Sequence, residues 1–154
     1  MQELFQNKYR IPSVRLQTWN YANAGMYFVT ICTQNRKGYF GEIVNGEIQL
    51  SEIGKIAETE WIKTVDMRPD MNLELGEFVV MNNHFHGIII IGENQYNLPS
   101  DTQRRDAMHR VSTNHFAAQS KNLASIIRGY KSAVTIYARK KISHLHGNHV
   151  FTTI

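Results

Sequence analysis

Two histidines separated by one residue, His84 and His86, are the residues in this sequence of 154 amino acids whose types and spacing best suit chemistry. They head an apolar run that ends at Ile91 and is typical of a β-strand. Residues i and i+2 of a strand point to the same face, so both imidazoles would lie side by side. Neutral imidazoles bind divalent metal ions, so the spacing predicts a metal site completed by a third protein group and waters. Two incidental strand histidines are the alternative.

The other histidines have a less informative pattern. Three of them cluster near the C-terminus in a segment typical of a loop, and two lie in a polar stretch without usable spacing. The cluster could bind a metal or be a surface tract without a role. In sequence order, these five residues are His109, His115, His144, His146 and His149.

The composition, 42% hydrophobic and 19% charged, is that of one globular domain, which we expect to span residues 1–154. A single cysteine, Cys32, excludes an internal disulfide. The N-terminus carries no apolar leader, and the longest aliphatic run is too short to cross a bilayer. We therefore expect a cytoplasmic protein without a membrane partner.

The net charge of +4 is unevenly distributed. Residues 1–99 hold 8 Lys/Arg and 11 Asp/Glu, whereas residues 100–154 hold 9 and 2. Clustered cations gain free energy by releasing counterions from phosphates, so the C-terminal third is the predicted nucleic-acid side. A solvated basic surface is the alternative. Trp19 and Tyr21, in an N-terminal arm over residues 1–25, could stack on bases or pack on the core.

Hydrophobic periodicity predicts an α+β chain. Residues 73–81 alternate as a strand, and Asn82-Asn83 turns into the histidine strand, which would put Phe85 on the core face and the histidines outward. Asn45-Gly46 predicts a small hairpin. The expected strands are 26–33, 39–44, 47–50, 73–81 and the histidine strand, and the expected helices are 51–68 and 122–142, with a flexible loop at about 93–120.

The second predicted helix has an apolar stripe and a basic opposite side. One side would face the core and the other would face phosphate. The predicted DNA-binding cations are those of this helix, Lys121, Arg128, Lys131 and Arg139, together with Arg15 and Arg36 nearer the N-terminus.

Three ordered blocks of the sequence form a distinctive pattern. The blocks are Tyr27-Phe-Val-Thr-Ile-Cys-Thr-Gln-Asn-Arg36 with Phe40-Gly41, Val79-Val-Met-Asn-Asn-His-Phe-His-Gly-Ile88, and Leu123-Ala-Ser-Ile-Ile-Arg-Gly-Tyr-Lys-Ser-Ala-Val-Thr135. This pattern resembles the REP-associated tyrosine transposases, within the single-strand HUH transposases of insertion sequences, where HUH denotes His, hydrophobic, His. The resemblance spans roughly residues 10–150.

The resemblance implies a ferredoxin-like antiparallel sheet backed by two helices, with the HUH histidines on a central strand. It implies that His84 and His86 bind Mg²⁺ or Mn²⁺, which polarises a phosphate of single-stranded or hairpin DNA. A tyrosine then attacks, giving a 5′-phosphotyrosine link and a free 3′-OH for strand transfer. Relatives occur as monomers and dimers, so a homodimer is a possible state.

The family's catalytic tyrosine has no counterpart here. In the family it lies on a further helix, which also tends to supply a third metal ligand, whereas this sequence stops at Ile154. We expect a C-terminally truncated chain, whether a truncated product, a frameshift remnant or a fragment. Tyr130 and Tyr137 are the remaining candidates, but both lie on the apolar stripe, which favours core tyrosines over nucleophiles.

Two other functional classes remain open. The first is a DNA-binding transposase remnant without enzymatic activity. The second is a nucleotide hydrolase with alternating histidines, which would require a third histidine where this sequence has Ile88.

Overall fold

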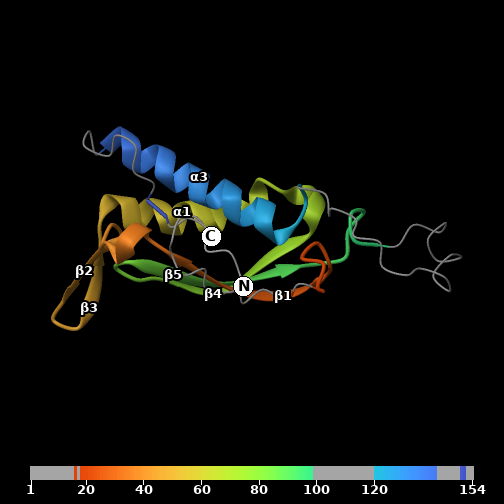
Figure 1. The fold of residues 1–154 in the computed structure, drawn as a ribbon, viewed down its shortest axis with the longest axis horizontal. Coiled ribbons are helices and arrows are strands. Elements are labelled where there is room, and N and C mark those ends of the chain that lie inside the picture. The colour runs from red at the N-terminus through yellow and green to blue at the C-terminus, as the bar shows by residue number, and fades with distance from the viewer. Residues whose placement is uncertain (1–15, 17, 99–119, 142–149, 152–154) are drawn as a thin grey trace, which may run out of the picture.

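The computed structural model describes residues 16, 18–98, 120–141 and 150–151, and these residues form an α+β fold. Its longer elements are five strands and two helices (Figure 1). In chain order they are β1 (Gly25–Cys32), β2 (Gly41–Val44), β3 (Glu47–Leu50), α1 (Glu52–Asp66), β4 (Leu73–Val80), β5 (His84–Ile91) and α3 (Leu123–Lys141), with 3-10 turns η2 (Gln34–Arg36) and η3 (Pro69–Met71).

The histidine strand β5 is central in an antiparallel sheet with the order β1-β5-β4. Beyond the end of β1, Phe151 pairs with Thr33, so this residue lies on the free side of β1. The order of strands and helices is consistent with a ferredoxin-like arrangement. The predicted fold class, with the two histidines on a central strand, is therefore confirmed.

Both helices lie on the same face of the sheet (Figure 1). Helix α1 begins where predicted because the Ser51 side chain caps it, accepting a hydrogen bond from Gly54 N at 3.1 Å and donating one to Tyr39 O at 2.7 Å. Its stripe of Ile53, Ala57 and Trp61 is buried. Capping and periodicity together explain why this segment forms a helix that packs on the sheet.

An aromatic cluster joins the sheet to both helices. The ring of Phe85 on β5 lies 4.7 Å from that of Trp61 on α1 and 5.4 Å from that of Tyr130 on α3. Gly87 leaves room for it, since a Cβ there would lie 2.8 Å from Phe85 and 2.9 Å from Trp61. Because Phe85 is fully buried under the helices, the residues on either side of it in β5 face the opposite way.

Strand β4 departs from the predicted alternation at one point. Its register with β5 shifts between Leu75 and Phe78, so β4 carries one extra residue there. The bulge puts Phe78 and Val80 on the core side with Leu73, whereas strict alternation separates them. Gly76 suits the bulge because a Cβ there would lie 2.9 Å from the Ile88 side chain.

The small hairpin is confirmed, and both turn residues have positive φ, 53° at Asn45 and 84° at Gly46. Most of the predicted loop lies outside the described residues, as do the first fifteen residues of the arm. Neither described helix combines the length and the apolar character needed to span a bilayer.

Replacing one buried and one exposed phenylalanine by alanine, on opposite faces of the sheet and in separate variants, tests this architecture. Phe85→Ala is expected to lower the free energy of unfolding by about 3–5 kcal/mol because it leaves a cavity under the helices. Phe28→Ala, at a side chain that is 68% exposed, should lower the free energy of unfolding by no more than about 1 kcal/mol, because it mainly loses strand propensity. Urea denaturation measures both, and equal losses would contradict the assignment of the two faces.

Candidate metal and nucleic-acid site

His84 and His86 lie side by side on the face of the sheet opposite the helices. Their ring centroids are 4.7 Å apart, with an angle of 78° between the ring planes. Both side chains are half-buried, whereas Phe85 between them is fully buried. The predicted juxtaposition and outward orientation of the two imidazoles are therefore present in the folded chain.

Each imidazole is oriented through its Nδ1 atom. His84 Nδ1 lies 2.8 Å from Asn83 Oδ1, and since an amide oxygen only accepts, Nδ1 is the donor. His86 Nδ1 lies 2.9 Å from the hydroxyl of Thr30, which pairs with it across β1 and β5 and can accept in the same way. When Thr30 accepts, both Nε2 lone pairs are available, which is the arrangement in which second-sphere groups fix metal-binding histidines.

The surroundings of His84 favour its neutral form. Burial lowers the pKa of His84 below its ordinary value, and the positive charges of His86 and Arg36 lower it further. Arg36 belongs to the turn after β1, where its carbonyl accepts a hydrogen bond of 3.2 Å from Asn83 Nδ2. Thus Arg36, a predicted DNA-binding cation, lies near the histidines, and its charge adds to the causes that favour the unprotonated form of His84.

The described residues supply two candidate ligands and no complete cage. No group of three His, Cys, Asp or Glu side chains among them could hold a metal ion. Cys32 pairs with His84 across the strands without completing such a group. Ile88, where a histidine hydrolase would need its third histidine, lies on the same face as the pair. Any ion here would therefore keep positions open for water, phosphate oxygens or other groups.

A pocket beside His86 was not anticipated from the sequence. It has a volume of about 320 Å³, and one wall is Phe28, whose ring stacks on that of His86 with centroids 5.5 Å apart and planes 18° apart. The sequence contained one signal for this pocket, because strand alternation in β1 places Phe28 on the same face of the sheet as the histidines. The residues lining the pocket are Phe28, Glu77, Phe78, Val79, His86, Gly87 and Ile88.

The predicted basic side of α3 is in a different layer from the histidines. Tyr130 turns one side of α3 toward Trp61 and Phe85, and Arg128 and Arg139 are exposed. Eleven residues are about three helical turns, so these two arginines share a face. Lys131 lies on a flank, with Nζ 5.7 Å from the centroid of the Phe151 ring. The sheet and its core separate this helix from the histidine face.

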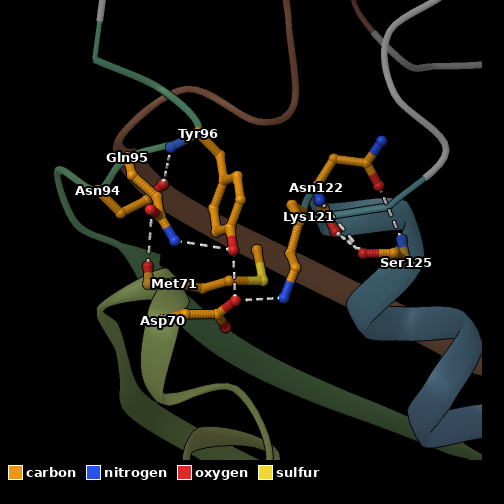
Figure 2. Close-up of polar contacts among 8 residues, drawn as sticks. All are labelled: Asp70, Met71, Asn94, Gln95, Tyr96, Lys121, Asn122 and Ser125. Atoms are coloured by element: carbon orange, nitrogen blue, oxygen red, sulfur yellow. Dashed lines mark hydrogen bonds and ion pairs between the residues drawn. The ribbon is translucent and has the colours of Figure 1, made fainter.

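Lys121 is engaged in a cluster just before α3, with Nζ paired to the carboxylate of Asp70 (Figure 2). The same carboxylate accepts a hydrogen bond of 2.6 Å from the Tyr96 hydroxyl. The hydrogen bond from Lys121 is the main cause that lowers the pKa of Asp70 below its ordinary value, and the hydrogen bond from Tyr96 is the next, while desolvation of the carboxylate opposes them. Asn122 then caps the helix, accepting from Ser125 N at 2.8 Å. Lys121 thus ties η3 to the start of α3.

Neither tyrosine candidate reaches the histidines within one subunit. Tyr130 is only 2% exposed, and its hydroxyl has no hydrogen-bond partner among the described residues. Burial, followed by the negative charge of Glu60, raises the pKa of Tyr130 above its ordinary value, which disfavours the phenolate. Tyr137 lies half-buried on the same helix, beneath Lys141. Tyr130 is therefore a core residue, as its place on the apolar stripe favoured.

Other predicted site residues fall outside the described part of the chain. They are the cation Arg15 and the five additional histidines, so their predicted roles stay predictions. In the arm, Tyr21 packs against the core, with its ring 5.9 Å from that of Tyr27. Trp19 is 43% exposed and donates to the Tyr27 hydroxyl at 3.1 Å.

Comparison with known proteins gives a relative but no activity. No family model matches the sequence. A Haemophilus influenzae protein, named only as an uncharacterized protein, is 35% identical over 131 residues, which are 83% of this chain and 68% of the relative.

Removing the Tyr130 hydroxyl should stabilise the protein. Tyr130→Phe eliminates a buried polar group without a described partner, so we expect the free energy of unfolding to rise by about 1 kcal/mol. The matched control is Tyr27→Phe. The Tyr27 hydroxyl donates to Asn23 O at 2.8 Å, so this variant should lower the free energy of unfolding by about 1 kcal/mol. Equal destabilisation by both changes would mean that Tyr130 has a partner.

The Asp70 cluster should give stability that depends on pH. The folded pKa of Asp70 is lowered, so its contribution is present above the unfolded carboxyl pKa of about 3.9 and is lost as pH falls through the folded value. Asp70→Asn is therefore expected to lower the melting temperature at neutral pH, with the difference from the unsubstituted protein vanishing in acid. Glu58→Gln, at an exposed carboxyl of α1, is the control, and a difference that grows in acid would contradict this prediction.

Proposed function

We propose that this chain, which belongs to the same family as the Haemophilus influenzae protein, binds single-stranded or hairpin DNA through a divalent metal ion held by His84 and His86. The observation that carries the proposal is the pair of adjacent imidazoles whose Nδ1 atoms are engaged by Asn83 and Thr30, leaving both Nε2 atoms for a ligand. On the basis of the resemblance to tyrosine transposases, we extend this proposal from DNA binding to strand cleavage and transfer in DNA transposition.

The donor set fits a divalent ion with open coordination positions. Two neutral imidazoles leave positions for waters and for phosphate oxygens, and the lowered pKa of His84 removes competition by protons at neutral pH. Imidazole suits Mn²⁺ better than Mg²⁺, which prefers an all-oxygen shell. We therefore propose that this site binds Mn²⁺ more tightly than Mg²⁺.

A bound divalent ion would offset the charge that develops on the phosphate oxygens during displacement. The chain's own residues hold and orient the site. Asn83 and Thr30 fix the two rings, and Arg36 adds a cation at the same end of the sheet, where it favours a DNA phosphate. Arg128 and Arg139 lie in the helix layer, so they would contact a different part of a bound DNA molecule.

DNA binding without cleavage is a second candidate, because Tyr130 is buried and Tyr137 lies on the helix side of the sheet. Cleavage would need an attacking hydroxyl from a group outside the described residues or from another molecule. Incubating the protein with hairpin DNA and Mn²⁺ and analysing it under denaturing conditions separates the candidates. A covalent protein–DNA adduct supports the transposase, whereas tight binding without an adduct supports the non-catalytic protein.

Titration calorimetry with Mn²⁺ tests the site directly. We expect one ion per chain, loss of binding in His86→Ala, and affinity reduced about 10- to 100-fold in Thr30→Val, which removes only the Nδ1 partner. Lowering the pH across the ordinary imidazole value of about 6.5 should weaken binding, because protonated imidazoles cannot ligate. Glu58→Gln, at an exposed carboxyl of α1, is the control and should leave Mn²⁺ binding unchanged.

The same variants decide whether the ion connects the protein to DNA. Binding of single strands should be stronger with Mn²⁺ than with a chelator, and His86→Ala should abolish that difference. Unchanged Mn²⁺ binding in His86→Ala, or single-strand affinity that is indifferent to Mn²⁺, would overturn the proposal.

A further inference from the structure

Among the described residues, several exposed apolar side chains lie on the sheet face that carries the histidines. Met26 and Phe28 on β1 are each 68% exposed, and Val79 on β4 is 43% exposed. No described helix or strand packs on this face, since both helices lie on the other one (Figure 1). Exposed apolar groups gathered on one face mark a binding surface more often than isolated ones do.

Phe28 gives this surface a specific geometry. Its ring stacks nearly parallel to that of His86, and both rings border the pocket of about 320 Å³. The pocket is mostly apolar, with His86 and Glu77 as its ionisable lining residues. A flat, narrow partner with apolar faces and a polar edge would suit such walls, and a nucleobase has this shape.

We propose that this pocket holds an unpaired base of single-stranded DNA stacked on Phe28, and that Glu77 selects a base with an exocyclic amino group. This inference rests on the proposed function, in which the neighbouring phosphate lies at His84 and His86. Aromatic side chains on the central strands of an open antiparallel sheet stack bases in the same way in RNA recognition motifs. Here Phe28 comes from β1 and His86 from the adjacent strand β5.

Charge is arranged along the face as this partner requires. Arg36 lies at the histidine end, where a phosphate would be, and Glu77 lines the pocket, where a carboxylate would repel phosphate. Carboxylates instead accept hydrogen bonds from base amino groups. Cytosine, adenine and guanine have an exocyclic amino group, whereas thymine has none.

The β4 bulge places Glu77 at this point. One extra residue lies between Leu75 and Phe78, opposite Ile88, which brings Glu77 to the pocket edge. Glu77 is exposed and forms no hydrogen bond or ion pair with another described residue. Packing two copies face to face would bury this carboxylate against apolar side chains at a large desolvation cost, which favours a ligand that offers donors.

The test measures the affinity of the full chain for fluorescent single strands of about twelve nucleotides, all thymine or with one central cytosine, adenine or guanine. Affinities measured in the presence of a metal chelator separate the contribution of base stacking from that of metal binding. Phe28→Leu should weaken binding of every strand about tenfold or more. A central 2-aminopurine should change its fluorescence when the unsubstituted protein binds, because it leaves its neighbouring bases, and Phe28→Leu should abolish that change. Ile136→Ala, an exposed apolar residue of α3, is the matched control and should change neither.

Glu77→Gln tests the selection of the base. It should equalise the affinities for strands with and without an amino-bearing base while leaving binding of the all-thymine strand equal or stronger, because a negative charge is removed. Glu58→Gln on α1 removes the same charge elsewhere and should keep the preference. Circular dichroism and sedimentation confirm that each variant is folded and report its oligomeric state.

The outcomes separate this inference from the proposed function. Mn²⁺-dependent binding that is unaffected by Phe28→Leu would overturn the stacking pocket and leave the metal site intact. A dimer that dissociates in Phe28→Leu without loss of DNA affinity would assign the face to a second copy and also overturn it. If the unsubstituted protein binds no single strand with or without Mn²⁺, both proposals fail.

Discussion

Burial of Phe85 beneath the two helices is the contact on which the arrangement of the candidate site depends. Its ring packs on Trp61 and Tyr130, and this fixes which face of β5 is inside. Because side chains alternate along a strand, His84 and His86 then point to the opposite face. The cost of exposing Phe85 therefore holds the two imidazoles on the sheet face that no described helix covers.

The same contact divides the protein's positive charge between two layers. Helix α3 must turn Tyr130 toward Phe85, so its exposed arginines look away from the sheet. Arg36 alone among the described predicted cations lies near the histidines, and it does so through a turn that also positions Asn83. A polyanion that touched both Arg36 and Arg128 would have to pass around an edge of the domain.

The histidine face combines polar and apolar side chains within a small part of the sheet. One end has imidazoles, a hydroxyl and a guanidinium, and the other has an exposed aromatic ring and a carboxylate beside a pocket. Nucleic acids carry charged phosphates beside flat bases, which is the chemistry of the partner that we propose for this face. The proposed strand cleavage would need an attacking hydroxyl on this face, and Tyr130 does not supply it because its side chain is buried against Phe85 in the core.

The sequence by itself determined the fold class, the elements, and the outward pairing of His84 and His86, because hydrophobic periodicity and strand alternation are local properties of the chain. It also favoured a core position for Tyr130 through the apolar stripe. Only the tertiary structure decided that Lys121 pairs with Asp70 and that the α3 arginines lie in another layer from the histidines. It likewise decided the stacking of Phe28 on His86 and the bulge beside Glu77. These features depend on register and on packing between distant segments, which no local pattern encodes.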